Sequence, residues 1–242
     1  LVRLTSITSR FGVGGNAMTG NIPTELGYLT KMTGGFWLDQ NAFSGTIPTE
    51  MGVLSEMAWQ IYLYSNSLNG TIPSQLGGLS GMLQRLRLNE NSLSGTLPTQ
   101  LGALTAMTAY FQLHSNSVTG KIPTQMGRLT AMTRSVNLYR NSFTGPAPTQ
   151  LGALSEMIER FALYSNALTG PIPTEMGGLR KMTSYFQLQS NSLSGFVPTE
   201  LGMLRNMTAY FYLSSNRLCG DIPTDVSRLS SSISSWDITT SN

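Results

Sequence analysis

The sequence has few charged residues and no long apolar segment. Asp, Glu, Lys and Arg make up 11% of its 242 residues, against roughly 25% in typical globular proteins. The net charge is only +3 and Lys and Arg are scattered, so nucleic acid is not a favoured partner. No stretch approaches the roughly 18 consecutive apolar residues of a membrane span, so the sequence predicts no membrane insertion.

The scarcity of titratable side chains also argues against catalysis. General acid–base and nucleophilic chemistry needs such groups to converge in one place, and the single histidine, His114, and the single cysteine, Cys219, occupy unrelated positions. No zinc-ligand spacing, phosphate-binding glycine loop or nucleophile elbow is present. We therefore expect a non-enzymatic protein with no cofactor and no bound metal.

Internal repetition is the dominant feature of the sequence. Three columns recur every 25 residues: Gly20 to Gly220, Asn16 to Asn216, and Pro23 to Pro223. A fixed period of this size is typical of solenoids, in which each repeat buries its apolar side against the next. We therefore predict one domain, residues 1–242, with nine 25-residue coils and the start of a tenth near Trp236.

The repeating unit is L-x-x-M-x-x-x-F-x-L-x-x-N-x-L-S-G-x-I-P-T-x-L-G-x. It resembles the plant type of leucine-rich repeat, whose hallmark is L-x-G-x-I-P, but each coil is one residue longer. The resemblance implies an α/β repeat solenoid: a right-handed coil with a parallel sheet on the concave face and short helical (3-10 type) or irregular segments on the convex side. Solenoids also need polar caps, and neither end shows one, so we expect these residues to belong to a longer chain or assembly.

One coil illustrates how the pattern predicts local structure. Phe111 and Leu113 alternate with polar residues, as in a short strand with one buried face. Asn116 follows at a turn, where its amide is expected to bond open backbone groups in an internal ladder. Pro123 suits the first turn of a short helix that carries Met126 inward, and the repeated Met column is expected to fill the core rather than bind metal.

The additional residue of each coil lies just before the strand, where three residues separate the Met from the first buried strand position. Because the insertion recurs in one place, it keeps the other columns aligned. It predicts a bulge or wider turn that brings one residue per coil to the rim of the sheet: Gly35, Gln60, Arg85, Tyr110, Arg160, Tyr185 and Tyr210.

Two variable columns beside the buried strand positions are the candidates for ligand binding. They are rich in Tyr and amide side chains, which give large contact area and adaptable hydrogen bonding. We expect a protein, peptide or glycan to bind there, on the concave face: Trp37, Tyr62, Tyr64, Arg87, Asn89, Gln112, His114, Asn137, Tyr139, Tyr164, Gln187, Gln189 and Tyr212. The alternative is that the Tyr rows only stabilise the sheet, and that the chain is a structural spacer or subunit of a cell-surface assembly.

A third interpretation comes from a hydroxyl column after the prolines. Regular threonine arrays on a flat face resemble those of ice-binding proteins, although a Ser or Thr beside a helix start is also a routine N-cap. The column consists of Thr24, Thr49, Ser74, Thr99, Thr124, Thr149, Thr174, Thr199 and Thr224, and Thr46, Thr71 and Thr96 begin another.

Three features favour an extracellular location. Asn69 and Asn206 begin N-glycosylation sequons. Cys219 is either a small buried residue or, as in extracellular members of the resembled family, half of a capping disulfide to a cysteine outside this segment. The resemblance to this family also favours an extracellular location.

Overall fold

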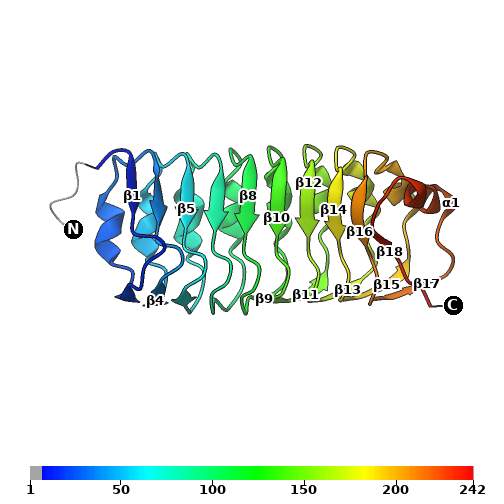
Figure 1. The fold of residues 1–242 in the computed structure, drawn as a ribbon, viewed down its shortest axis with the longest axis horizontal. Helices are drawn as coiled ribbons and strands as arrows, with labels where there is room; N and C mark the ends of the chain where they lie inside the picture. The colour runs from blue at the N-terminus through cyan, green and yellow to red at the C-terminus, as the bar shows by residue number, and fades with distance from the viewer. Residues whose placement is uncertain (1–6, 242) are drawn as a thin grey trace.

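The computed structural model describes residues 7–241, which form a row of stacked coils (Figure 1). Every coil contributes a short strand to one face and a helical turn to the opposite face. The first and last described coils lie at opposite ends of the row (Figure 1). Among the described residues no helix is long and apolar enough to cross a membrane.

The main sheet has ten parallel strands in the described part of the chain, each paired with the strands of the neighbouring coils. In spatial order they are β1 (Arg10–Gly12), β3 (Gly35–Trp37), β5 (Gln60–Tyr62), β7 (Arg85–Arg87), β8 (Ala109–Gln112), β10 (Arg134–Asn137), β12 (Glu159–Ala162), β14 (Ser184–Gln187), β16 (Ala209–Tyr212) and β18 (Trp236–Asp237). The predicted parallel sheet and the tenth strand at Trp236 are confirmed.

Two smaller parallel sheets lie along one edge of the solenoid, after the Asn column (Figure 1). The first is β2 (Thr19–Asn21), β4 (Ala42–Gly45) and β6 (Ser67–Leu68); the second is β9 (Thr119–Gly120), β11 (Ser142–Pro146), β13 (Ala167–Gly170), β15 (Ser192–Phe196) and β17 (Arg217–Cys219). The Gly column at this edge has positive φ, for example +76° at Gly120, a conformation that glycine adopts without steric cost.

The opposite face consists of 3-10 helices and one α-helix. They are η1 (Thr24–Tyr28), η2 (Thr49–Val53), η3 (Ser74–Gly78), η4 (Thr99–Ala103), η5 (Thr124–Arg128), η6 (Thr149–Ala153), η7 (Thr174–Gly178), η8 (Thr199–Met203), α1 (Thr224–Ser227) and η9 (Arg228–Ser231). Pro123 is extended (φ −64°, ψ 137°) and is the N-cap of η5, one residue earlier than the first-turn position that we predicted.

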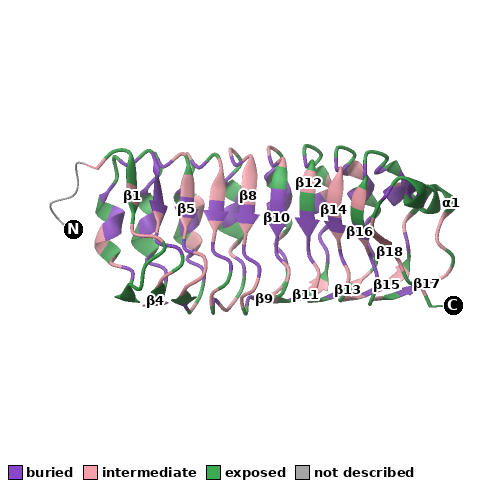
Figure 2. Cartoon of the chain, in the orientation of Figure 1, coloured by how far each residue is buried: buried purple, intermediate pink, exposed green. Residues whose placement is uncertain are grey.

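The core runs the full length of the row between the main sheet and the helices (Figure 2). The Met column from Met32 to Met207 is at most 1% exposed, so its predicted core role is confirmed. At the C-terminal end, aromatic rings of successive coils stack: Phe186 on Phe211 at 5.1 Å, and Phe211 on Trp236 at 4.9 Å between ring centroids. Each fully buried Leu, Met or Phe contributes about 1.5–3 kcal/mol through removal of apolar surface from water.

The Asn column forms the predicted internal ladder. Asn116 Nδ2 donates to the carbonyl oxygens of Leu88 and Leu113, both at 3.0 Å, and its Oδ1 accepts from the backbone N–H of Leu93 at 3.0 Å. The same bonds recur in neighbouring coils, so each Asn connects its own turn with the preceding one. These side chains satisfy backbone groups that would otherwise be buried without partners.

The predicted bulge exists in only part of the solenoid. From β8 onward the residue before the first buried strand position has positive φ, namely Tyr110, Ser135, Arg160, Tyr185 and Tyr210. The pairs Arg134↔Ala109 and Val136↔Phe111 bracket one unpaired residue on each strand, so the same outward turn interrupts the ladder in successive coils.

In β3, β5 and β7 the expectation of a bulge was wrong. Gly35 pairs with Gln60, and Gln60 with Arg85, in regular register without positive φ. The Arg85 N–H also donates to the Trp59 carbonyl oxygen at 3.0 Å, so regular backbone pairing extends back beyond the strand.

Candidate functional site

The main sheet brings the first variable column into one line. Register pairs connect Trp37 to Tyr62, Tyr62 to Arg87, Arg87 to Gln112, Gln112 to Asn137, Asn137 to Ala162, Ala162 to Gln187 and Gln187 to Tyr212. The second column follows each strand by two residues and is also linked from coil to coil, for example by the Ser115 N–H donating to the Tyr139 carbonyl oxygen at 3.1 Å. We call this surface the main sheet face.

A stack of three rings lies at the centre of the main sheet face. The rings of His114 and Tyr139 are 4.3 Å apart at an interplanar angle of 7°, and those of Tyr139 and Tyr164 are 4.3 Å apart at 9°. They follow three neighbouring strands, β8, β10 and β12. Because the ring faces cover one another, the stack presents ring edges and phenol hydroxyls outward.

Burial determines the protonation of this stack. The pKa of His114 is lowered to about 4, mainly by desolvation; the negative charge of Glu90 opposes this shift, and the Arg140, Arg160 and Arg87 guanidinium groups contribute to it. Desolvation also raises the pKa of Tyr139 to about 12. At neutral pH the three rings are therefore uncharged and the phenols keep their protons.

A second cluster lies on the N-terminal side of the stack, on β5 and β7. The Arg87 guanidinium carbon is 5.0 Å from the Tyr62 ring centroid and 5.1 Å from that of Tyr110. Arg85 lies 4.9 Å from the Tyr110 centroid, and its Nη1 donates to the Tyr62 hydroxyl at 2.7 Å. Such cation–π contacts stabilise by about 0.5–1 kcal/mol each at exposed sites. Tyr64 joins the cluster through an edge contact with Tyr62 at 5.7 Å.

The bulge residues form a rim above the strands, which the sequence only partly indicated. Arg160 lies over Tyr185 at 4.7 Å, and Tyr185 stacks on Tyr210 at 4.3 Å between ring centroids. The sequence placed Arg85, Arg160 and the three tyrosines of this column at the rim of the sheet, but Arg85 and Arg160 were not named as binding residues. The sequence feature that could have identified these two arginines is their position in the same column as the three tyrosines.

Several predicted contact residues are buried rather than exposed. Asn137 is 1% exposed, Asn89 5% and His114 8%, so Asn137 is covered by its neighbours and is not a surface contact. The side-chain oxygens of Asn89, Asn137 and Gln189 are buried without a hydrogen-bond partner among the described residues. Asn89 and Gln189 belong to the second column and flank the three-ring stack, one on each side.

The residues predicted for modification lie away from this face. Asn69 is exposed just before Gly70 at the edge of the solenoid. Asn206 is exposed and donates to the Arg180 carbonyl oxygen at 2.8 Å. Cys219 is a free, half-buried thiol on β17.

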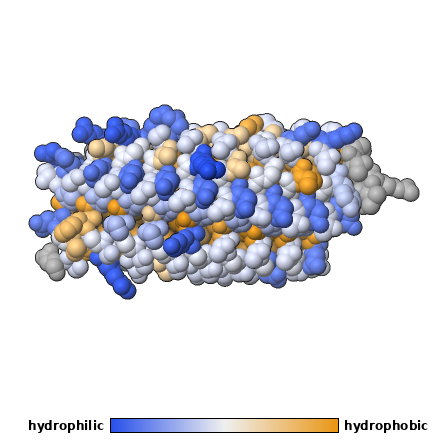
Figure 3. Space-filling model, turned by 180° about the vertical axis from the view of Figure 1, so that it is seen from behind, coloured by the Kyte–Doolittle hydropathy of each residue, from blue (hydrophilic) through white to orange (hydrophobic). Residues whose placement is uncertain are grey.

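The hydroxyl column does not cap the helices. Pro occupies the N-cap position of η1 to η8, and none of these helices has a side-chain cap bond. Most of the Thr side chains are exposed, and six hydroxyls of the column bond the following side chain, as Thr174 bonds Glu175 at 3.3 Å. The capping alternative is therefore wrong. Figure 3 shows hydrophilic side chains recurring along this face.

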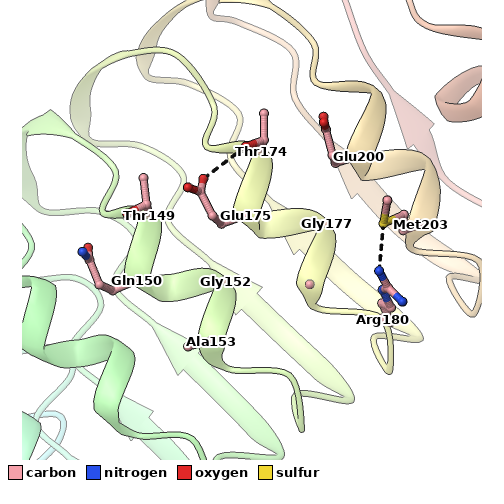
Figure 4. A pocket seen from close by; sticks show the side chains of 11 residues that line it. Thr149, Gln150, Gly152, Ala153, Thr174, Glu175, Gly177, Arg180, Glu200 and Met203 are labelled. Atoms are coloured by element: carbon pink, nitrogen blue, oxygen red, sulfur yellow. Dashed lines mark hydrogen bonds between the residues drawn. The ribbon is translucent and has the colours of Figure 1, made fainter.

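A shallow groove of about 520 Å³ also lies on the helix side, across η6, η7 and η8 (Figure 4). Thr174 and Glu175 face each other at its centre, and Arg180 reaches Met203 at one end (Figure 4). Gly152 and Gly177 form its floor, because an added Cβ there would lie within 2.5 Å of the backbone of the next coil. Among the described residues no cluster of His, Cys, Asp or Glu is arranged to hold a metal.

Comparisons with known proteins agree on one family. The family model "Leucine Rich Repeat" matches residues 82–104. The chain is 36% identical to the plant peptide hormone receptor RGFR1 in complex with RGF2, covering 90% of this chain and 34% of that one, with a TM-score of 0.83. It is 26% identical to the Arabidopsis receptor kinase HAESA ectodomain with an IDA peptide hormone, covering 99% and 42%, with a TM-score of 0.74.

A solved plant ice-binding protein is also similar, with 26% identity, a TM-score of 0.65, and coverage of 91% of this chain and 75% of that one. None of the curated proteins matches the sequence. The chain spans about two fifths or less of the length of the receptor structures cited above. It belongs to the leucine-rich repeat family, and its repeats are a 25-residue variant of the plant type.

Proposed function

We propose that the chain is a non-enzymatic, extracellular module that binds a polypeptide segment through the main sheet face. The observation that carries the proposal is the three-ring stack of His114, Tyr139 and Tyr164, flanked by the Arg87 cluster. Tyr and Arg side chains at the centre of an interface are typical of binding hot spots. The similarity to receptors solved with peptide hormones supports the same class of ligand.

The geometry favours a peptide over a glycan. A sugar ring that stacks on an aromatic residue needs an open ring face. In the stack the inner faces are closed at 4.3 Å, and Tyr62 and Tyr110 carry a guanidinium group over their rings. Edges and hydroxyls remain available, which suits the amides and carbonyls of an extended chain.

The test is selection from a displayed library of random peptides of about 12 residues. Such a peptide, when extended, spans roughly 40 Å, close to the ~43 Å width of ten strands. The best selected peptide is then titrated against a variant with Tyr64→Ala, Tyr139→Ala and Tyr164→Ala. We expect the dissociation constant to rise at least about 100-fold, because a central Tyr contributes about 2 kcal/mol.

The control is Tyr28→Ala, since Tyr28 is 59% exposed and ends η1 on the helix side. It should leave the dissociation constant within about twofold of the original. Circular dichroism melting shows whether the triple variant is folded. Unchanged peptide binding by the folded triple variant would reject the main sheet face as the site.

The second candidate function is ice binding, supported by two observations. The hydroxyl column is mostly exposed and makes no helix-cap hydrogen bonds, and a plant ice-binding protein is similar over most of both chains. Thermal hysteresis of the purified chain decides it: a freezing-point gap that disappears when Thr99, Thr124 and Thr149 are changed to Tyr would support this function. The spacer interpretation would instead be favoured by a partner docked on an edge or on the helix side.

A further inference from the structure

Three guanidinium groups on or beside the main sheet face have no carboxylate partner among the described residues. Arg87 ends β7, Arg140 follows β10, and Arg160 lies at the start of β12. The ion pairs found among residues 7–241 involve other residues: Arg134 with Glu159, Lys181 with Glu156, and Arg228 with Asp225. The centre of this face therefore carries uncompensated positive charge in a protein that has few charges overall.

These three groups lie beside the three-ring stack in the sheet: Arg140 directly follows Tyr139, Arg160 is on the strand that precedes Tyr164, and Arg87 is on β7, next to the strand that precedes His114. Arg140, Arg160 and Arg87 all act in the same direction on the pKa of His114, below the larger effect of burial. Arg140 and Arg160 also lower the pKa of Tyr164, against its desolvation. Neighbouring strands lie about 4.8 Å apart, so Arg140 and Arg160 are within two strand spacings of every ring of the stack.

One carboxylate beside the stack offsets only one of these three positive charges. Glu90 is the only acidic residue that acts on His114. Its Oε2 accepts from the Ser65 hydroxyl at 2.5 Å, and its Oε1 accepts from Asn89 Nδ2 at 3.3 Å. These donors are neutral, so Glu90 keeps its negative charge, and Arg87, Arg140 and Arg160 together with Glu90 still carry a net charge of +2.

We propose that the segment bound at the three-ring stack is acidic: an extended polypeptide whose Asp or Glu carboxylates lie against Arg87, Arg140 and Arg160. This inference rests on the proposed function and specifies its ligand. Guanidinium groups bind carboxylates through two parallel hydrogen bonds. Arg87 and Arg160 lie three strands apart, about 14 Å, which an extended chain covers in about four residues.

An anionic polysaccharide shares the charge but fits the surface less well. Its sugar rings would find the inner faces of the stack closed. Its binding is therefore an outcome of the test rather than the proposal.

The experiment reads the composition of the peptides selected from the random library. We expect the selected peptides to be enriched in Asp and Glu. A variant with Arg87→Gln, Arg140→Gln and Arg160→Gln should raise the dissociation constant of the best peptide about 100-fold, at about fivefold per charge. Added salt should weaken binding to the original chain more than binding to this variant.

The matched control removes three arginines elsewhere. Arg128, Arg205 and Arg217 are exposed and lie outside the main sheet, so changing all three to Gln gives the same net charge. Binding should change less than twofold in the control. Because Arg87 packs on tyrosines, a second variant with only Arg140→Gln and Arg160→Gln leaves that packing intact, and it should weaken binding about 25-fold.

The outcomes separate this inference from the proposed function. Neutral or basic peptides whose binding depends on Tyr139 would overturn the acidic ligand and leave the function in place. Equal loss in the control would show non-specific attraction and overturn the inference. Polygalacturonate binding more tightly than any selected peptide would overturn it in favour of a polysaccharide, and selection of no peptide would overturn both proposals.

Discussion

Removal of one ladder side chain should destabilise the solenoid far more in its middle than at its end. In Asn116→Ala the backbone N–H of Leu93 loses its partner, and Leu93 is completely buried. The Leu88 and Leu113 carbonyl oxygens each lose one bond but keep a second, from Asn91 and Asn141 respectively.

The expected loss of stability follows from this difference between an N–H that loses its only partner and carbonyl oxygens that keep one of two. A buried N–H without a partner costs about 1–3 kcal/mol, and each lost carbonyl bond costs about 0.5–1.5 kcal/mol. The sum is about 2–6 kcal/mol, centred near 4. For a protein of this size 1 kcal/mol shifts the melting temperature by about 2–4 °C, so we expect Asn116→Ala to melt roughly 8–16 °C lower.

Asn16 provides the matched control at the first coil. It is exposed and donates only to the carbonyl oxygens of Val13 and Gly14. Asn16→Ala should therefore lower the melting temperature by no more than about 4 °C. Thermal melts followed by circular dichroism measure both variants. Equal shifts in the two, or a shift below about 4 °C in Asn116→Ala, would refute the reasoning.

Three further predictions concern pH and glycine. His114 has a folded pKa of about 4, below its unfolded value of about 6.5. The free energy of unfolding should therefore be highest above about pH 6.5 and fall by up to about 3 kcal/mol as the pH falls towards 4, because the unfolded state then binds a proton that the folded state does not. Urea unfolding across this range should show the loss, and His114→Gln should abolish this pH dependence. Gly127→Ala should destabilise by about 1–3 kcal/mol in thermal melts despite its better helix propensity, because the new Cβ would lie 2.3 Å from the Gln150 carbonyl oxygen; a stabilised variant would contradict this. Ser135→Gly should stabilise by about 1 kcal/mol because Ser135 has a φ of +59°, whereas Gln60→Gly at the regular counterpart should cost about 0.5–1 kcal/mol; shifts of the same sign in the two melts would contradict the bulge assignment.

Much of the fold could be predicted because it repeats. A column that recurs every 25 residues must occupy the same place in every coil, so the buried Met column and the Asn ladder followed from the residues of one coil, and the resemblance to leucine-rich repeats implied the parallel sheet. Each of these features needs only the coil and an identical neighbour. The reasoning was less successful for Thr124, which looked like a cap, because the N-cap position belongs to Pro123.

The candidate site could be predicted only as a list of columns. That Tyr139 and Tyr164 share one face follows from strand alternation, and the structure agrees. That Asn137 is covered while Tyr139 remains accessible depends on the sizes of the side chains in the adjacent coils, which differ at these positions. The role of Arg160 depends on a positive φ that places its guanidinium over Tyr185.

The sequence by itself determined the architecture, the core columns and the Asn ladder, since each depends on the residues of a single coil and recurs in every coil. Only the tertiary structure decided where the strand start changes from the regular form at Arg85 to the bulged form at Tyr110. It also decided which rings stack and which guanidinium groups surround them. These features arise between non-identical side chains of neighbouring coils, 25 residues apart in sequence and one strand spacing apart in space, where the repeat no longer specifies the partner.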